Sequence, residues 1–225
     1  MSHCRPSGIQ IVLFDAVGTL IYPDPPVAQV YFDAGSRHGS KLAQPQIAER
    51  FRAVFAGACD EQATSEERER SRWRDIVSQV FCDVSGEQEA LFEELWQHFA
   101  RAQNWSVFAD VAPAWQSLMT AGVRIGIASN FDQRLVGICR QLSPLDTAEH
   151  VFQSAALGYS KPHPAFFQAI EQRLDIPPQA IFMVGDSQEN DIAPAQAAGW
   201  AAVRVDRQSE SAHANVIHSL TRISI

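Results

Sequence analysis

Lysine is almost absent from this chain, since only Lys41 and Lys161 stand among its 18 basic residues. The 26 acidic residues outnumber the basic ones, and the net charge is −8. Such a balance argues against a nucleic-acid partner, because non-specific nucleic-acid binding needs a basic surface. It leaves room for an anionic small-molecule substrate, because an acidic protein can still carry local positive patches.

Cysteine is also scarce and scattered. The four cysteines, Cys4, Cys59, Cys82 and Cys139, show no CxxC spacing, which argues against a zinc site or a disulfide scaffold and predicts buried or free thiols. The first eight residues lack the apolar stretch of a signal peptide. No run reaches the roughly 18 apolar residues that span a membrane. We therefore expect a cytoplasmic protein with no membrane partner.

The 225 residues suffice for one large domain or for a core with a smaller inserted domain. Two regions of the chain differ in their pattern of apolar residues. From Val27 to about Trp105, apolar residues such as Ile47 and Phe51 recur at helical spacing, with no strand pattern between them. This stretch is predicted to be a helical bundle. Within it, the charge-dense segment 64–72 is expected to form a solvated face or a linker.

Strand-like and helix-like segments alternate from Val107 onward. Such alternation predicts an α/β fold, with a parallel sheet and crossover helices. A final helix is expected over residues 206–225. The predicted strands of this part are 123–130, 151–158 (with its loop), 181–186 and 200–206, and the predicted helices are 112–122, 133–142, 163–174 and 191–199.

A further strand is predicted near the start of the chain, where residues 11–14 form a short apolar run typical of a strand buried on both faces. The run stops at Asp15, and a carboxylate at the carboxyl end of a parallel strand lies where α/β sheets bind ligands. Gly18 then permits a tight turn, and Thr19 adds a hydroxyl. On this stretch alone, Asp15 could equally cap a turn.

Polar residues end two of the later apolar runs as well. Ser129 and Asn130 end one run, Asp186 ends another with Asp191 five residues later, and Lys161 stands between them. Each has an ordinary structural explanation when taken alone. Ser129 and Asn130 could cap the next helix, Lys161 could be an exposed loop cation, and Asp186 could lie in a turn.

In this order the set resembles the haloacid dehalogenase-like hydrolase superfamily. The motifs extend from Asp15 to Asp191, nearly the whole chain, so the ordered set is specific although each motif is weak. The resemblance implies a Rossmann-like, doubly wound parallel sheet in a core of residues 1–22 and 106–225. It also implies an α-helical cap domain, residues 23–105, inserted after the first motif.

The resemblance further implies a role for each motif residue. Asp15 would be the nucleophile, while Ser129 and Lys161 would hold the transferred group. Asp191 would bind Mg²⁺ directly, or would orient a metal-bound water or Lys161 instead. The expected substrate-binding residues are Gly18, Thr19, Ser129, Asn130 and Lys161. The expected Mg²⁺ ligands are Asp15, the backbone carbonyl of Val17, Asp186 and Asp191.

Val17 departs from the pattern of the family's phosphatases, which carry a second Asp at this position. That Asp protonates the leaving alcohol and later deprotonates the attacking water, and valine can do neither; Asp24 is a conceivable substitute. The 2-haloacid dehalogenases have Tyr there, use no metal and lack the carboxylate matching Asp186. The phosphonoacetaldehyde hydrolases use a cap lysine that forms a Schiff base. Only Lys41, in a polar neighbourhood, could serve here.

We therefore predict a Mg²⁺-dependent phosphohydrolase of a small phosphorylated metabolite, working through an aspartyl-phosphate on Asp15. Two alternatives stay open. One is a 2-haloacid dehalogenase-like hydrolase, and the other is a catalytically weakened binding or regulatory member of the family. A monomer or a homodimer is expected, and the sequence does not identify the substrate.

Overall fold

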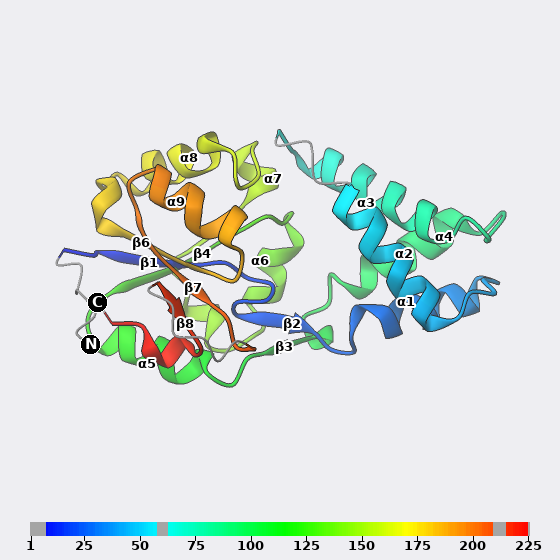
Figure 1. Ribbon diagram of the computed structural model, residues 1–225, viewed down its shortest axis with the longest axis horizontal. Coiled ribbons are helices and arrows are strands. Elements are labelled where there is room, and N and C mark those ends of the chain that lie inside the picture. Colours follow the sequence, from blue (N-terminus) through cyan, green and yellow to red (C-terminus); the bar gives the residue numbers. More distant parts are fainter. Residues whose placement is uncertain (1–7, 58–62, 209–214, 225) are drawn as a thin grey trace.

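The computed structural model describes residues 8–57, 63–208 and 215–224. The strands of its main sheet are β1 (Ile11–Phe14), β4 (Arg124–Ser129), β5 (His150–Gln153), β6 (Ile181–Gly185), β7 (Ala201–Val205) and β8 (Val216–Ile217). They lie in the order β5-β4-β1-β6-β7-β8, and every neighbouring pair is parallel (Figure 1). The α/β fold with a parallel sheet is thereby confirmed.

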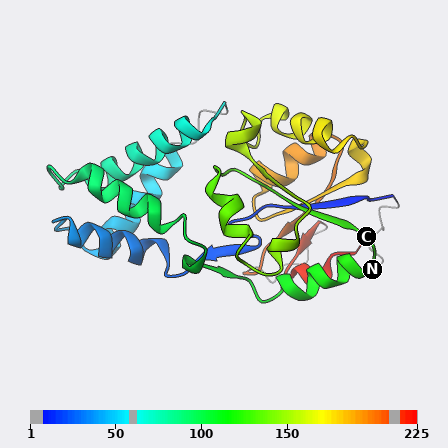
Figure 2. The same cartoon turned by 180° about the vertical axis from the view of Figure 1, so that it is seen from behind.

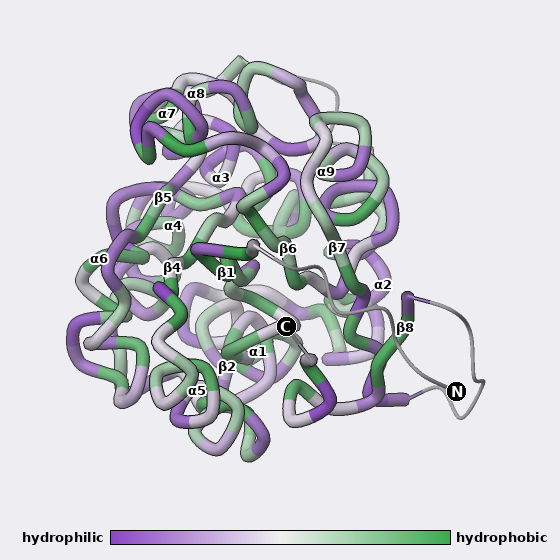
Figure 3. The backbone as a smooth tube through the Cα atoms, turned by 90° about the vertical axis from the view of Figure 1, so that its left-hand side faces the viewer, coloured by the Kyte–Doolittle hydropathy of each residue, from purple (hydrophilic) through white to green (hydrophobic). Residues whose placement is uncertain are grey.

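Helices cover both faces of this sheet. They are α5 (Val111–Thr120), α6 (Arg134–Cys139), α7 (Ser154–Leu157), α8 (Pro164–Leu174) and α9 (Ala193–Ala197). Alternate residues of β1 point to opposite faces, so Val12 and Phe14 pack in the cluster that contains α5 and α6. Ile11 and Leu13 pack in the cluster with α8 and α9. Figure 3 shows hydrophobic β6 in the interior between these layers. The predicted doubly wound arrangement is confirmed.

Four further helices lie together beside one end of the sheet (Figures 1 and 2). They are α1 (Val27–Arg37), α2 (Gln44–Gly57), α3 (Glu66–Val80) and α4 (Gln88–His98). Their apolar faces form a cluster of their own, which includes Tyr31, Ile47, Phe81 and Phe92. The antiparallel strands β2 (Ile21–Pro23) and β3 (Trp105–Val107) link this bundle to the sheet. The division of the chain into domains stays a prediction.

The charge-dense segment 64–72 was expected to form a solvated face or a linker. It is not a linker but mainly the first turns of α3, on which Glu67 and Arg68 are exposed. Ser65 caps this helix by accepting a hydrogen bond from the Arg68 N–H at 3.2 Å. Glu69 is only 7% exposed. Its burial is tolerated because the Thr64 hydroxyl donates to its carboxylate at 2.8 Å and the Arg72 guanidinium forms an ion pair with it at 3.3 Å.

The expected final helix over 206–225 is wrong in the part of that tail that the structure describes. There, two residues pair with β7 as strand β8, and Leu220 packs in the core. The helical pattern of 191–199 instead splits into a π-helical turn and α9. The remaining short turns are η1 (Ala102–Asn104), η2 (Leu145–Thr147), η3 (Pro178–Ala180), the π-helical η4 (Gln188–Ile192) and η5 (Leu220–Arg222).

The described cysteines are free thiols. Cys82 and Cys139 are free, exposed and buried respectively, as expected, whereas Cys4 and Cys59 lie outside the described residues. Burial raises the pKa of Cys139 to about 12, so this thiol is inert at neutral pH. Within the described ranges, no helix combines the length and the apolar character that crossing a bilayer demands.

Candidate active site

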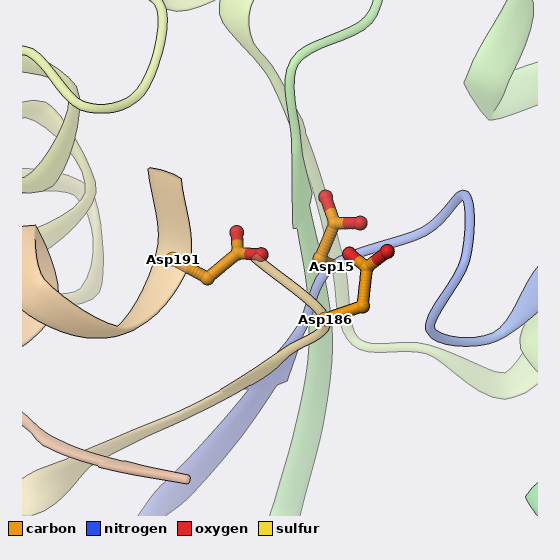
Figure 4. A group of neighbouring side chains, drawn as sticks. All are labelled: Asp15, Asp186 and Asp191. Atoms are coloured by element: carbon orange, nitrogen blue, oxygen red, sulfur yellow. The ribbon is translucent and has the colours of Figure 1, made fainter. Parts of the chain in front are cut away.

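Three carboxylates converge at the carboxyl ends of the central strands. Asp15 follows β1, Asp186 follows the adjacent β6, and Asp191 comes from the π-helical turn η4 (Figure 4). One oxygen from each lies within 4.8 Å of the others. Neighbouring parallel strands end at the same edge of the sheet, which is why residues far apart in the sequence meet there. Of these side chains, Asp15 and Asp191 are buried and Asp186 is open to solvent.

Lys161 binds two of these carboxylates. Its Nζ donates to Asp15 Oδ1 at 2.8 Å, to Asp191 Oδ1 at 2.5 Å and to the carbonyl oxygen of Ala128 at 3.0 Å. The residue is only 4% exposed, so it is not the exposed loop cation that its position before a proline also allowed. A buried ammonium with three acceptors is a fixed positive charge beside Asp15.

The crowding of charge shifts the pKa values of the cluster. Burial alone would lower the pKa of Lys161, but Asp15 and Asp191 together hold it above its ordinary value. Burial raises the pKa of Asp191 to about 6 in spite of the nearby ammonium. Asp186 reaches solvent, but its carboxyl group is partly desolvated by the surrounding atoms, and this desolvation, followed by the charge of Asp15, raises its pKa. Acidic side chains that repel one another in this way favour a positively charged ligand between them.

The donor set suits a hard divalent cation. Carboxylate oxygens are the ligands that Mg²⁺ prefers, and Asp15 and Asp186 lie side by side in Figure 4. Asp191 is engaged differently. One of its oxygens accepts from Lys161, and the other accepts from the Ser187 N–H at 3.0 Å. Its geometry therefore favours the second expected role, in which it orients Lys161.

Glycine permits the close packing of this cluster at two positions. A Cβ on Gly18 would lie 2.3 Å from Asp186 Oδ2, and Gly18 also adopts a φ of +88°. A Cβ on Gly185 would lie 2.3 Å from the carboxyl carbon of Asp191. Both glycines therefore make room for carboxylates. The expected substrate-binding role of Gly18 stays a prediction.

Replacing Gly18 with alanine should weaken divalent-cation binding and destabilise the fold. A left-handed alanine costs about 1–2 kcal/mol, and displacing Asp186 should add about 1–3 kcal/mol. The matched control is Gly39→Ala, which has a φ of +89° and open space around its Cβ. Denaturant unfolding and calorimetric Mg²⁺ titration measure both effects. Equal unfolding free energies and equal Mg²⁺ affinities in the two variants would contradict the role of Gly18.

Ser129 and Asn130 follow β4 beside the same cluster. Ser129 is buried and borders the cavity described below. The Asn130 amide binds the main chain of Lys161 twice, since its Nδ2 donates to the carbonyl oxygen at 2.8 Å and its Oδ1 accepts from the N–H at 2.7 Å. Asn130 thus anchors the lysine, and direct substrate binding by Asn130 stays a prediction.

Thr19 and Val17 differ in their access to ligands. Thr19 is fully buried, its hydroxyl has no hydrogen-bond partner within the described ranges, and it does not border the cavity. Its expected contact with substrate therefore finds no support in the geometry. Val17 is 36% exposed and does border the cavity, whereas its carbonyl as a metal ligand stays a prediction.

A polar cavity of about 440 Å³ opens over the carboxylates. It is lined by the motif residues Asp15, Ser129, Lys161 and Asp186. Residues that the sequence analysis did not identify as candidates line it as well. Those additional residues include Phe55, Glu69, Arg72, Trp73, Phe131 and Arg134. Helical periodicity could have identified them only as bundle or surface positions. The exposed Lys41 borders neither this cavity nor the apolar one described below.

Three known proteins or structures resemble this chain over most of its length. One is the haloacid dehalogenase-like hydrolase domain-containing protein 3 of Xenopus laevis, 27% identical, which aligns over 85% of this chain and 82% of its own. The second is the ribulose-1,5-bisphosphate 5-phosphatase of Halopiger xanaduensis, 29% identical, which aligns over 89% of this chain and 86% of its own. The third is the solved structure of a defluorinating L-2-haloacid dehalogenase, which shares the fold with a TM-score of 0.75 and 18% identity. The superposition covers 98% of this chain and 97% of the dehalogenase.

A sequence model of one family also matches most of the chain. It is that of the haloacid dehalogenase-like hydrolases, and it matches residues 9–199, the range that carries all of the clustered carboxylates and Lys161. The match confirms the resemblance that was based on the order of the motifs. The chain belongs to the haloacid dehalogenase-like hydrolase family.

Proposed function

We propose that this protein is a Mg²⁺-dependent phosphohydrolase that forms an aspartyl-phosphate on Asp15. The main observation in support is the hydrogen bond from the Lys161 ammonium to Asp15 at 2.8 Å, inside a cluster of three carboxylates. The relative from Halopiger xanaduensis, named as a phosphatase of a sugar bisphosphate, supports phosphate esters as the substrate class. We propose a small phosphorylated metabolite as the substrate.

In the proposed reaction, a carboxylate oxygen of Asp15 bonds to phosphorus, and the bond from phosphorus to the leaving oxygen breaks. The leaving oxygen takes up a proton from solvent, because Val17 has none to give. Water then bonds to phosphorus and loses a proton to solvent, and the bond from phosphorus to Asp15 breaks, which releases phosphate and restores the carboxylate. Lys161 balances charge on the transferred group, and Ser129 donates to its oxygens. A Mg²⁺ held by Asp15 and Asp186 would screen the repulsion between carboxylate and phosphate.

We also propose that residues 23–105 act as a cap over a core of residues 1–22 and 106–225. The cavity supports this division, because Arg72 and Trp73 from α3 border it together with Asp15 and Asp186 from the edge of the sheet. The strands β2 and β3 pass between the two parts. A bundle placed in this way would shield the aspartyl-phosphate from bulk water and would choose the substrate.

Replacing Asp186 with asparagine should lower Mg²⁺ affinity at least about tenfold, because the change removes a charged ligand from the cation. The matched control is Glu189→Gln, an equal change of charge at an exposed position of the same loop. Isothermal titration calorimetry compares the three proteins. If Asp186→Asn binds Mg²⁺ as tightly as Glu189→Gln does, Asp186 is not a ligand.

The test of the proposed function is hydrolysis of a panel of phosphate monoesters and 2-haloacids, with and without Mg²⁺. We expect turnover of at least one phosphate ester, lost on chelation. Metal-independent release of halide would favour the dehalogenase alternative instead. Asp186 argues against that alternative, and so do Phe166 and Phe167. These two residues follow the motif lysine but are fully buried in the sheet-facing core, where they offer no hydroxyl to the site.

One observation favours a second candidate function, that of a catalytically weakened member. Val17 offers no proton to a leaving alcohol and no base to water. Binding of beryllofluoride in the presence of Mg²⁺, without turnover of any phosphate ester, would support that candidate. Turnover on the same panel would exclude it.

A further inference from the structure

A second cavity, here called the apolar chamber, lies among the helices of the bundle. It encloses about 290 Å³ and is bordered by residues of α1 to α4, of which most are aromatic. Among them are Tyr31, Phe51, Phe92 and Trp96, and Phe99 borders the cavity directly after α4. Its volume is close to the lower end of the roughly 300–1,000 Å³ of small-molecule sites.

The apolar chamber adjoins the polar cavity over the carboxylates. Six residues border both cavities: Val17, Phe55, Trp73, Asn130, Phe131 and Arg134. Val17 is the residue of this boundary closest in sequence to Asp15, two positions away. A ligand held at Asp15 by one end therefore has an apolar space next to its other end.

The polar groups at this boundary are already engaged. The Arg134 guanidinium forms a salt bridge with the buried Asp132 at 2.6 Å and lies 3.4 Å from the centre of the Trp96 ring. The Asn130 amide is occupied by the main chain of Lys161. Tyr31 borders the apolar chamber alone, and burial raises its pKa, so its phenol stays neutral. The apolar chamber therefore offers no unbalanced charge to a second anionic group of a ligand.

We propose that the apolar chamber binds the carbon part of the substrate. The substrate would then be a phosphate monoester of an aromatic or branched hydrocarbon alcohol about the size of one or two rings. This inference rests on the proposed function, because it assumes that the phosphate lies at Asp15. An apolar Val17 suits such a ligand, since the side chain lies where the leaving group would pass from one cavity to the other.

Binding of two phosphonates in the presence of Mg²⁺ tests this inference without any turnover. Benzylphosphonate and methylphosphonate carry the same anionic head and differ in the group that the apolar chamber would hold. We expect benzylphosphonate to bind about 10- to 100-fold more tightly in calorimetry, because burying apolar groups in a matching pocket contributes that much selectivity. Trp73, Trp96 and Trp105 border the chamber, so only benzylphosphonate should change the tryptophan fluorescence strongly.

A substitution that fills the apolar chamber with a larger side chain provides a second test. Val27→Phe adds a ring at a partly buried position of the chamber wall and should weaken benzylphosphonate binding at least about tenfold while sparing methylphosphonate. The control is Val54→Phe, because Val54 is partly buried in the same bundle but does not border the chamber. Phe55→Ala, a truncation at a position 37% exposed, should also weaken benzylphosphonate binding if Val27→Phe does not fold.

The outcomes separate this inference from the proposed function. Equal affinity for both phosphonates, or equal loss in Val27→Phe and Val54→Phe, would overturn the apolar chamber as a substrate site and leave the phosphohydrolase proposal standing. If neither phosphonate nor inorganic phosphate binds in the presence of Mg²⁺, both proposals fail together. Selective binding of benzylphosphonate that only Val27→Phe or Phe55→Ala weakens supports both.

Discussion

Asp15→Asn is expected to abolish phosphate ester hydrolysis, with kcat falling at least about 10³-fold. The amide is a far poorer nucleophile than the carboxylate, and it leaves Lys161 with one negative partner in place of two. Steady-state kinetics on the best substrate of the panel measures the loss. Mass spectrometry of acid-quenched protein should show a phosphorylated wild type and an unmodified variant.

A matched control separates this chemistry from a general change of charge. Asp24→Asn removes the same charge nine positions later, directly after β2, but Asp24 borders neither cavity, and its carboxylate accepts a hydrogen bond from the Ser106 hydroxyl at 2.9 Å. We expect Asp24→Asn to keep wild-type turnover, which also speaks against Asp24 as a substitute acid. Wild-type turnover in Asp15→Asn would refute the nucleophile and, with it, the proposed mechanism.

Val17→Asp is expected to raise turnover of alkyl phosphates about 10²–10⁴-fold, the range that a positioned acid–base group contributes. The gain should be much smaller for acyl phosphates and nitrophenyl phosphate, whose leaving groups depart without a proton. The side chain of residue 17 is 36% exposed, so a carboxylate there can be hydrated instead of being buried without partners. The measurement is kcat for paired alkyl and nitrophenyl phosphates.

Val17→Asn is the control for this gain, because it has the size and polarity of aspartate but cannot exchange a proton in the reaction. Thermal unfolding establishes first that both variants are folded. In the wild type, the absent base should slow hydrolysis of the aspartyl-phosphate, so the adduct on Asp15 should accumulate during turnover of activated substrates. A folded Val17→Asp variant without any gain on alkyl phosphates would show that position 17 does not control proton transfer.

The order of polar residues in the sequence predicts which side chains meet at the candidate site. Short apolar runs identify buried parallel strands, and such strands must end at a shared edge, so Asp15, Ser129 and Asp186 could be expected to meet. Lys161 illustrates the limit of this reasoning. Its three acceptors come from the residue after β1, from β4 and from η4, and only the folded chain brings them around one ammonium.

Other features depend on contacts that periodicity does not encode. Strand β8 consists of two residues, and its conformation follows from pairing with β7 and not from local propensity. Glu69 tolerates burial because Thr64 supplies a hydrogen bond and Arg72 an ion pair to its carboxylate. The apolar chamber is bordered by residues of all four helices and by residues after β1 and β4, whereas a helical stripe of aromatic residues predicts only that such residues face inward. The sequence therefore predicted that the bundle is helical, but it did not predict the cavity between the helices.

The burial of Lys161 also divides the two lysines of the chain by chemical reactivity. Amine-reactive esters acylate the uncharged form of an exposed amine, and Lys161 is charged, enclosed and held by three acceptors. Lys41 lies exposed between α1 and α2 and borders neither cavity. Mild acylation should therefore place a dye or a surface linker on the bundle at one side-chain amine while the amine beside Asp15 stays unmodified.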